Sequence, residues 1–368
     1  MKFIFWQNVI SIHQSAFIKA LAKEHDVTLV AEEEITDQRR ADGWSVPDMG
    51  EAKIILNPDD AAINALLGCI DARQVFSGID AFPMVFKAFK SAVKRGCDIS
   101  VMMEPYQWRG AKGFLRRCKY AWFFKRYGNQ ISRIFATGDL GVRAFRKAGF
   151  PAHKLYQWGY FTEQVATDII YENAKPKIIF VGSIDTRKNI LSLVAAAGKC
   201  RNLYEELLIV GGGPLEPELK NAIASNRKIH YLGRLRNEAV GELIASCDLL
   251  VLPSLFDGWG AVVNEALLQG TRVLCSDNCG ASALLDGETR GGVFQLSKPE
   301  SLQETLTYWL GKGALTADER KGIISWAEKN ISGETAAEYF KKRMTGQAAD
   351  IPWLTPPPTL QRRADSLT

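Results

Sequence analysis

The sequence predicts an α/β protein that contains two doubly wound parallel sheets. Three observations favour this class. The first 31 residues follow the order strand, helix, strand; a second regular series of strands and helices begins at Ile178; and residues 155–176, which end in proline, separate the two series. With 368 residues, 46% of them hydrophobic and 24% charged, the chain has the composition of a globular protein and the length of two or three domains.

The first series predicts a parallel sheet in the N-terminal half. Its strands are expected at 2–7, 27–31, 52–56, 74–77, 98–103 and 133–137, with a helix near 15–25 and further helices between the later strands. No glycine-rich dinucleotide fingerprint follows the first strand, so NAD binding is not expected there. The polar residues Asn8, Ser11, His13 and Gln14 are either ligand contacts or ordinary loop and cap residues.

The second series is more regular. Strands are expected at 178–181, 207–210, 229–232, 249–252 and 272–276, and helices at 190–200, 215–224, 237–245 and 261–269. Ligands of such sheets bind at the carboxyl ends of the strands, which here are rich in glycine. Further helical segments are expected near 299–312 and 316–345, and 351–368, with three consecutive prolines, reads as a tail.

We therefore divide the chain at the proline-ended segment 155–176, which we interpret as the connection between two domains. The N-terminal domain spans 1–160 and the C-terminal domain spans 175–330. The remaining residues, 331–368, are expected to form a C-terminal helix and tail, with a return to the N-terminal domain as one option.

One stretch of the second half, residues 248–270, combines an anion site with two carboxylates. A buried strand ends at Pro253, a loop with Gly258 and Gly260 follows, and a helix then begins. The free N–H groups of a helix start attract an anion. Asp257 and Glu265 flank this start and can accept hydrogen bonds from hydroxyl groups. The arrangement suits a ligand with a sugar at each end and phosphate in the middle.

At these residues the chain resembles the retaining glycosyltransferases of family 4. The family carries two glutamates with seven residues between them after a V-x-P-S strand end, and this chain reads VLPSLFDGWGAVVNEAL, with Asp257 in the place of the first glutamate. The resemblance is strong over about 178–290 and weaker over 1–160. It implies the GT-B fold, in which two Rossmann-like domains face each other across a cleft, the N-terminal one binding the acceptor and the C-terminal one the nucleotide sugar.

The resemblance also implies roles for the residues of this stretch. Glu265 would bind the ribose hydroxyls of a nucleotide sugar, and Asp257 would contact the transferred sugar. Backbone groups in the glycine loop and at the helix start would lie against the sugar and the diphosphate; these residues are Gly258, Gly260, Ala261, Val262 and Val263.

Two other strand ends match family positions. In the loop that begins at Gly182, Lys188 matches the lysine that meets the diphosphate, where a cation stabilises the charge on the leaving group. Ser183 stands where the family has arginine, and Arg187 is a candidate to compensate for that loss. Arg234 and Leu235 follow the strand where the family holds the nucleobase.

In the N-terminal half, Glu104 directly follows the strand expected at 98–103. The family often places a histidine near this strand end, facing the donor sugar. Glu104 would bind a sugar hydroxyl or orient the acceptor, or it is simply a solvated loop residue. Asp257, Glu104 and Lys188 are therefore the predicted catalytic residues.

The cysteines and the acidic motifs concern the compartment and the metal requirement. The seven cysteines form no C-x-x-C pair, which is typical of reduced thiols in a cytoplasmic protein. No D-x-D triad is present, so the metal-dependent class of glycosyltransferase is not favoured. We expect no metal and no cofactor, because the nucleotide diphosphate sugar is a substrate.

Positive charge is concentrated in one region. Residues 86–133 hold twelve Lys or Arg against Asp98 and Glu104, an excess of ten in a chain whose net charge is +5. Residues 109–127 fit a helix with Phe114, Leu115, Cys118, Ala121 and Trp122 on one face, and with Arg116, Lys119, Phe123 and Arg126 on another side. This pattern suits peripheral contact with an anionic membrane, at the inner face of the cell membrane. The alternative is a core-facing helix with a basic rim, and nucleic acid is not favoured.

The sequence thus predicts a cytoplasmic retaining glycosyltransferase, a hexosyltransferase that uses a nucleotide diphosphate sugar, with UDP as the favoured nucleotide. The expected acceptor is a saccharide or lipid-linked saccharide of a bacterial surface polysaccharide, such as lipopolysaccharide or capsule. Two alternatives stay open. One is a GT-B sugar-nucleotide epimerase. The other is a catalytically weak sugar-nucleotide-binding protein, which would fit the departures at Asp257, at Ser183 and at Ala283, where the family has a glutamate.

Overall fold

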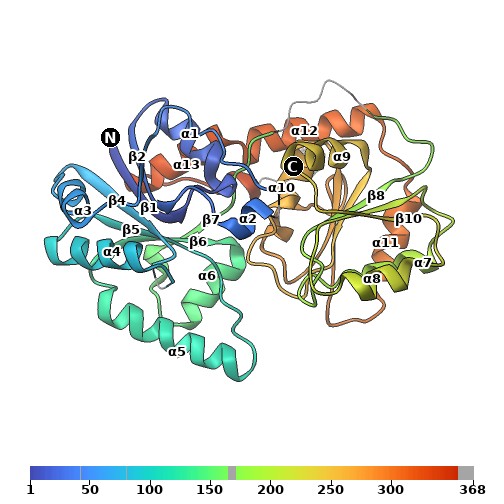
Figure 1. Ribbon diagram of the computed structural model, residues 1–368, viewed down its shortest axis with the longest axis horizontal. Helices are drawn as coiled ribbons and strands as arrows, with labels where there is room; N and C mark the ends of the chain where they lie inside the picture. Colours follow the sequence, from blue (N-terminus) through green and yellow to red (C-terminus); the bar gives the residue numbers. More distant parts are fainter. Residues whose placement is uncertain (42, 80, 165–170, 355–368) are drawn as a thin grey trace, which may run out of the picture. The chain divides into compact units, whose positions relative to one another are not determined.

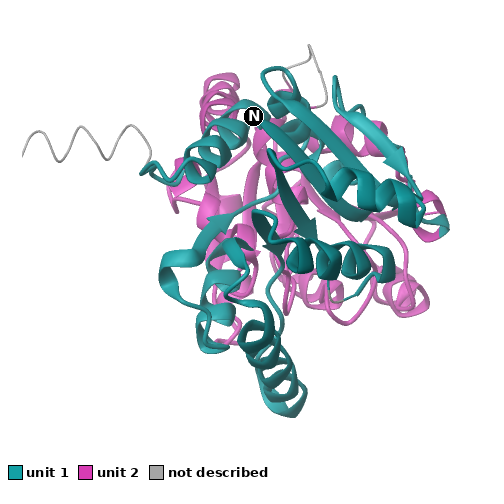
Figure 2. Ribbon diagram, turned by 90° about the vertical axis from the view of Figure 1, so that its left-hand side faces the viewer, with its two compact units in different colours: residues 1–37, 46–163, 332–351 teal, residues 38–45, 164–331, 352–368 magenta. Residues whose placement is uncertain are grey.

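The computed structural model describes residues 1–41, 43–79, 81–164 and 171–354. The proline-rich part of the predicted tail and the middle of the predicted connection therefore lie outside the described residues. The chain divides into two compact units, which Figure 2 distinguishes by colour. Unit 1 comprises Met1–Asp37, Val46–Glu163 and Ser332–Ile351, and unit 2 comprises Gln38–Ser45, Gln164–Ile331 and Pro352–Thr368.

The described residues of unit 1 form a seven-stranded sheet in the order β3-β2-β1-β4-β5-β6-β7. All neighbouring strands are parallel. The strands are β1 (Lys2–Val9), β2 (Asp26–Glu33), β3 (Lys53–Leu56), β4 (Ala72–Ser77), β5 (Ile99–Met103), β6 (Ile131–Thr137) and β7 (Leu155–Trp158). The first six confirm the predicted strands.

Strand β7 corrects the interpretation of 155–176 as connection throughout. Leu155–Trp158 pairs in parallel with β6 as the last strand of the sheet. Only Trp158 of the four residues is buried, as expected for a strand with one neighbour. The sequence therefore lacks the apolar run that identified the central strands.

The helices of unit 1 cover this sheet (Figure 1). They are α1 (Ser15–Ala22), α3 (Asp60–Leu67), α4 (Pro83–Arg95), α5 (Gly110–Tyr127), α6 (Gly138–Lys147) and α13 (Gly333–Met344). Two 3-10 turns, η1 (Ile12–Gln14) and η2 (Ala152–Lys154), accompany them. Helix α2 (Asp37–Ala41) begins at Asp37, the last residue of the first segment of unit 1, and its other residues belong to unit 2. Helix α13 packs against α1 although the two are far apart in sequence.

The phenyl ring of Phe340, on α13, lies at the centre of an aromatic cluster in unit 1. It contacts the rings of Phe3, Phe5, Phe17, Phe135 and Trp158 at centroid distances of 5.4, 5.9, 5.1, 5.0 and 5.8 Å. Such edge-on and tilted aromatic pairs are favourable beyond their buried area. The last α-helix among the described residues is therefore part of the core of the first unit.

Unit 2 contains a second parallel sheet, with six strands among its described residues in the order β10-β9-β8-β11-β12-β13. The strands are β8 (Ile178–Val181), β9 (Leu207–Val210), β10 (Ile229–Gly233), β11 (Leu249–Leu252), β12 (Arg272–Ser276) and β13 (Gly291–Phe294). The helices are α7 (Ile190–Lys199), α8 (Glu216–Ile223), α9 (Asn237–Ser246), α10 (Val262–Leu268), α11 (Ser301–Gly311) and α12 (Ala317–Ile331), with η3 (Gly280–Leu284) and η4 (Pro352–Leu354). The five strands predicted for this half and its predicted helices up to residue 312 are confirmed, whereas β13 was not predicted.

The helical segment predicted over 316–345 is interrupted. Helix α12 ends at Ile331, and α13 begins at Gly333. Between them Ser332 has extended backbone angles, φ −72° and ψ 165°, and its side chain accepts a hydrogen bond from the Thr335 N–H. This is the geometry of an N-cap. The two helices belong to different units, so the break at Ser332 is where the chain leaves unit 2.

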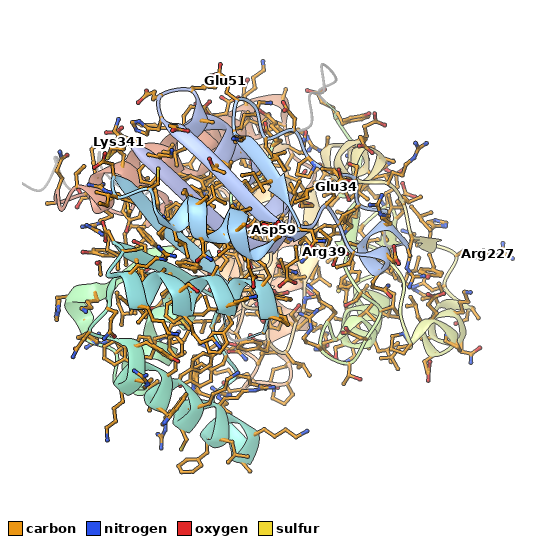
Figure 3. The ribbon with its side chains drawn as sticks, turned by 60° about the vertical axis from the view of Figure 1, so that its left-hand side comes forward. Glu34, Arg39, Glu51, Asp59, Arg227 and Lys341 are labelled. Carbon is orange, nitrogen blue, oxygen red and sulfur yellow. The ribbon has the colours of Figure 1, made fainter. Side chains whose placement is uncertain are left out.

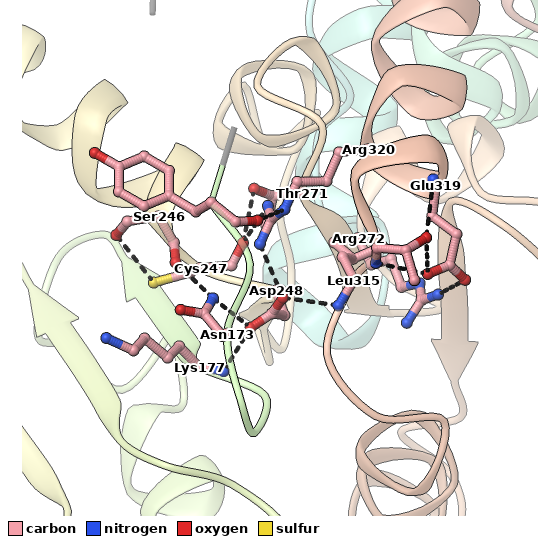
Figure 4. Close-up of polar contacts among 12 residues, drawn as sticks. Asn173, Lys177, Ser246, Cys247, Asp248, Thr271, Arg272, Leu315, Glu319 and Arg320 are labelled. Carbon is pink, nitrogen blue, oxygen red and sulfur yellow. Dashed lines mark hydrogen bonds and ion pairs between the residues drawn. The ribbon is translucent and has the colours of Figure 1, made fainter. Parts of the chain in front are cut away.

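A buried ion pair anchors α12 within unit 2. The Arg320 guanidinium donates to Asp248 Oδ1 at 2.8 Å, and the two side chains are 3% and 2% exposed. The backbone N–H groups of Lys177 and Leu315 also donate to the Asp248 carboxylate, each at 2.8 Å. Figure 4 shows these contacts, which join the segments before β8, β11 and α12.

The apolar face predicted for α5 does not pack on the core, as one of the two interpretations of the sequence had proposed. The buried residues of this helix are Gly113, Phe123 and Tyr127. The predicted apolar face points outward instead, and Phe114, Leu115 and Trp122 are 54%, 66% and 64% exposed. Phe123, which was expected on another side of the helix together with three cations, is buried, whereas those cations are exposed. Among the described residues, none of the helices combines the length and hydropathy of a membrane span.

Candidate functional site

The loops at the carboxyl edge of the unit 2 sheet bring the predicted site residues together. Strands β9, β8 and β11 are neighbours in this sheet, so the loops after them lie side by side. The loops after β9 and β8 approach each other closely. A Cβ atom added at Gly211 would lie 1.9 Å from the Gly182 carbonyl oxygen, which excludes any other residue from position 211.

The loop after β8 is shaped by Asp185. Its carboxylate accepts hydrogen bonds from the Lys188 N–H at 2.8 Å and from the Ser183 hydroxyl at 2.7 Å. Asn189 then adopts a left-handed conformation, with φ 56°, and precedes α7. Ser183, which stands where the resemblance expects arginine, is thus engaged within the loop. Sequence reasoning missed Asp185, although an aspartate that closes a turn over the following residues is a recognisable signal.

The loop after β11 is bound to this first loop. The Leu255 N–H donates to the Arg187 carbonyl at 2.8 Å. Lys188 Nζ donates to Asp257 Oδ2 at 2.6 Å, with the two side chains 12% and 13% exposed, and Arg187 Nη1 lies 3.6 Å from the same oxygen. The structure therefore brings Arg187, Lys188 and Asp257, predicted separately from the sequence, into one cluster that we call the cation–carboxylate cluster.

Backbone geometry fixes the position of Asp257. The Asp257 N–H donates to the Asn278 carbonyl at 3.0 Å, and its own carbonyl accepts from the Gly280 N–H at 3.1 Å. The chain then turns at Gly260, whose φ is 94°. A Cβ atom there would lie 2.8 Å from both Cys279 Sγ and Leu252 Cδ2. The turn that directs the chain into α10 therefore requires glycine at this position.

Glu265 lies in the first turn of α10. Burial raises the pKa of its carboxyl to about 7, and the charge of Lys188 opposes this shift to a smaller extent. Gly258, Ala261 and Val262 lie in the turn and helix start as predicted, whereas the Val263 N–H already donates to the Gly260 carbonyl at 2.9 Å. The Val263 N–H can therefore donate to a ligand only if it shares its hydrogen with the Gly260 carbonyl.

Arg234 lies over the glycine turn after β9. A Cβ atom at Gly212 would lie 2.2 Å from its Cζ, so the guanidinium covers this turn. Arg234 Nη1 is 3.6 Å from Glu216 Oε1, which accepts from the Gly213 N–H at 2.9 Å. This backbone hydrogen bond is the main cause that lowers the pKa of Glu216. Leu235 is partly buried. Glu216, at the start of α8, is a further residue that the sequence did not reveal.

Glu104, the third predicted catalytic residue, lies in unit 1 just after β5. Its carboxylate accepts a hydrogen bond from the Tyr160 hydroxyl. The Tyr160 ring in turn meets the edge of the His13 ring at a centroid distance of 4.7 Å. His13 was one of several polar loop residues in the sequence, and nothing in the sequence indicated that Tyr160 would join it at Glu104.

Comparison with known proteins gives a family match over the second unit. Residues 175–312 match the family described as glycosyl transferases group 1. This range contains Gly182, Lys188, Asp257 and Glu265, and the rest of the unit 2 site described above. The part of the chain before residue 175 lies outside the match.

Two curated relatives and one solved structure agree with this match. An uncharacterized glycosyltransferase of Methanocaldococcus jannaschii is 27% identical over 173 residues, which cover 44% of this chain and 44% of the relative. The N,N'-diacetylbacillosaminyl-diphospho-undecaprenol alpha-1,3-N-acetylgalactosaminyltransferase of Campylobacter jejuni is 22% identical over 224 residues, covering 60% and 56%. The matched region thus spans about half the length of these relatives.

The solved structure extends the likeness to both units. HepE from Anabaena, in complex with UDP, superposes with a TM-score of 0.70 at 14% identity and covers 94% of this chain and 100% of its own. The two parallel sheets therefore have the arrangement of strands and helices found in GT-B proteins. The chain has the GT-B fold, and its residues 175–312 are similar to the family described as glycosyl transferases group 1.

Proposed function

We propose that this protein is a retaining glycosyltransferase that moves a hexose from a nucleotide diphosphate sugar, with UDP as the nucleotide, to a saccharide acceptor. The observation that carries the proposal is the cation–carboxylate cluster. It places Lys188 and Asp257 in contact at the carboxyl edge of a sheet whose domain matches a glycosyltransferase family. The donor is a substrate, and the proposal includes no metal and no cofactor.

The geometry suggests how the donor is held. Glu265 accepts hydrogen bonds from the ribose hydroxyls, Arg234 and Leu235 lie beside the base, and the glycine turns allow the diphosphate to approach the backbone. Lys188, helped by Arg187, binds the diphosphate. For this to happen Lys188 must give up part of its contact with Asp257, which then becomes available to a hydroxyl of the transferred sugar.

The chemical step follows from these contacts. The bond between the anomeric carbon and the diphosphate oxygen breaks, and a bond to the acceptor oxygen forms on the same face of the sugar. The departing phosphate oxygen takes the proton of the acceptor hydroxyl. Lys188 stabilises the negative charge that develops on the leaving group, and Glu104, held by the Tyr160 hydroxyl, orients the acceptor.

The acceptor is proposed to be a lipid-linked saccharide of a bacterial surface polysaccharide, such as lipopolysaccharide or capsule. Support comes from the Campylobacter jejuni relative, whose name specifies a diphospho-undecaprenol acceptor. A cytoplasmic protein that acts on such an acceptor must reach the membrane. We therefore include peripheral contact of residues 86–133 with the anionic inner face, and no binding of nucleic acid.

Turnover of UDP-sugars tests this function. UDP release should be slow with the donor alone and faster when a saccharide acceptor is added, and it should be unaffected by EDTA. Glu265→Ala should lower kcat/KM at least about tenfold, because hydrogen bonds to a charged group contribute about 1.5–3 kcal/mol. Glu218→Ala, which removes an exposed glutamate of α8, is the matched control and should behave as the parent protein.

The alternative functions give different results in the same assay. An epimerase would convert the sugar of the donor without an acceptor. A sugar-nucleotide-binding protein would be stabilised by a UDP-sugar and would release no UDP. Normal turnover by the Glu265→Ala variant would overturn the assignment of the donor site.

A further inference from the structure

Helix α5 has two apolar faces, of which the domain uses one. Gly113, Phe123 and Tyr127 are buried, and Tyr120 and Phe124 pack beside them against the core of unit 1. The contact is close at the start of the helix, where a Cβ atom on Gly113 would lie 2.2 Å from the carbonyl carbon of Trp108. A surface helix of a globular domain needs only this one stripe of apolar residues.

The second apolar face points away from the core. Leu115, Cys118 and Trp122 follow the i, i+3, i+7 spacing of one helix side, and Phe114 and Ala121 lie next to them. All five residues are exposed. We call this set the outer face. No other α-helix of the described residues has more than one large hydrophobic side chain in the exposed class, so the outer face is not explained by ordinary surface composition.

Cations border the outer face. Lys112, Lys119 and Arg126, seven residues apart, run along one flank of the helix. On the other flank, the Arg117 guanidinium carbon lies 5.2 Å from the centre of the Phe114 ring. Residues 105–138, which include the whole of α5, contain eight Lys or Arg and no Asp or Glu. In Figure 3, α5 lies at the lower edge of unit 1, and several of its side chains extend away from the unit.

We propose that α5 lies in the plane of an anionic lipid bilayer with its outer face inserted among the acyl chains. The anionic surface follows from charge complementarity, since lysine and arginine side chains at the flanks can reach the headgroups while their stems cover apolar surface. Tryptophan is the side chain that favours this interface. Nucleic acid would satisfy the cations but would leave the apolar side chains Leu115 and Cys118 of the outer face without a favourable contact.

This inference goes beyond peripheral electrostatic contact, because it requires apolar insertion. It does not depend on the proposed sugar transfer, since the vesicles used to test it need neither donor nor acceptor. Contact through charge alone would be abolished by salt, whereas an inserted helix retains binding that depends on its apolar side chains.

Co-sedimentation of the full chain with vesicles tests the proposal. The parent protein should bind vesicles that contain phosphatidylglycerol and bind pure phosphatidylcholine much more weakly. Leu115→Ser and Trp122→Ser change no charge, and each should weaken binding to the anionic vesicles at least fivefold at both low and moderate salt. Ile70→Ser is the matched control, because Ile70 is 97% exposed on unit 1 and lies outside α5; it should bind as the parent does.

A second readout follows Trp122 directly. Vesicles should shift the tryptophan emission to shorter wavelength in the parent protein, and the shift should be lost or much reduced in Trp122→Phe. Thermal stabilisation by a UDP-sugar should be unchanged in every variant, which shows that the fold and the donor site are intact.

Three results would overturn the inference. The first is an absence of binding to anionic vesicles, and the second is parent-like binding by both Leu115→Ser and Trp122→Ser. The third is a concentration-dependent dimer that Leu115→Ser abolishes, since a second copy of the chain would then cover the outer face.

Discussion

Asp257 and Glu265 show how one loop and one helix turn give two carboxyl groups different properties. Asp257 contacts Lys188 at 2.6 Å, so its negative charge has a close partner. Glu265 is partly buried on α10, and its pKa rises to about 7 because removal of its carboxyl from water disfavours the charged form. Near neutral pH, Glu265 is therefore divided between its protonated and charged forms, while Asp257 is held in an ion pair.

The raised pKa of Glu265 predicts that donor affinity depends on pH. A charged carboxylate accepts hydrogen bonds from both ribose hydroxyls, so the affinity for a UDP-sugar should increase from pH 6 to pH 8. Titration calorimetry with a UDP-sugar measures this, and the diphosphate of that ligand, esterified at both ends, does not itself titrate in this range. Glu265→Gln should bind more weakly and lose most of the pH dependence. An unchanged slope in this variant would contradict the assignment.

The same shift has a consequence for stability with the opposite sign. Because the folded-state pKa lies above the ordinary value of 4.5, Glu265 favours folding below that value, and this contribution is lost as the pH rises through about 7. In the absence of ligand, unit 2 should therefore become slightly more stable as the pH falls from 8 to 6, while donor binding becomes weaker.

The sequence predicted some residues of the site and missed others. Lys188, Asp257 and Glu265 stood at recognisable positions after strands and at a helix start. Asp185, Glu216 and Tyr160 did not, because each acts on a loop or side chain that only the fold brings near. The contact between Lys188 and Asp257 also needed the structure, since the sequence places them on different loops.

At the level of elements, the loops after β8 and β11 are joined by the cation–carboxylate cluster and by the hydrogen bond between Leu255 and Arg187. The Lys188–Asp257 pair is largely shielded from water, so it is stronger than a surface ion pair. In the function that we propose, a diphosphate and Asp257 compete for the same ammonium group. We therefore expect the affinity of the loop pair for phosphate to be lower than its positive charge alone would give.

This competition predicts opposite effects on binding and on transfer. Asp257→Asn should bind UDP several-fold more tightly, because Lys188 no longer has an anionic partner. The same variant should transfer sugar at least about tenfold more slowly, since it loses a hydrogen bond between a charged group and the sugar. UDP binding and UDP-sugar turnover are measured in parallel. Glu288→Gln, which neutralises an exposed carboxylate of the same unit, is the control. Weaker UDP binding by Asp257→Asn would contradict the competition.

The elements that the sequence missed share a physical cause. Strand β7 is mostly half exposed, and β13 contains Gly291 and Gly292, so neither has the apolar run that marks a central strand. The break at Ser332 depends on one capping hydrogen bond within a long helical pattern. For α5 the helical spacing was correct, but two apolar faces compete for the core, and packing decides between them.

The alternation of strands and helices was sufficient to predict the class of the whole molecule. Each βαβ unit constrains its neighbours to a parallel sheet, so errors at single elements do not change the result. The division of the chain into units is less accessible to sequence, because it depends on long-range packing. Unit 2 is held by contacts such as those of Asp248, which joins segments before β8, β11 and α12.

The Asp248 contacts predict a large effect of a small change on the stability of the molecule. Asp248→Asn would leave the buried Arg320 charge without compensation, which costs about 3–5 kcal/mol. Urea unfolding should show this loss. Lys23→Ala removes one partner of an exposed ion pair with Glu334, whose side chains are 58% and 67% exposed, and should cost much less than the loss of the buried pair. Equal effects of the two substitutions would contradict the structural role of the buried pair.

The position of α13 in the chain has a consequence for the order in which the protein is made. The sheet of unit 1 is complete once the ribosome has added Trp158, yet the ring of Phe340, which the surrounding aromatic residues enclose, is not added until all of α12 has been made. Synthesis therefore supplies almost the whole of unit 2 before unit 1 can close its core. The core of unit 1 is therefore completed only after nearly all of unit 2 has been made, and a nascent chain that ends before Phe340 lacks the ring that packs against Phe3 and Phe17.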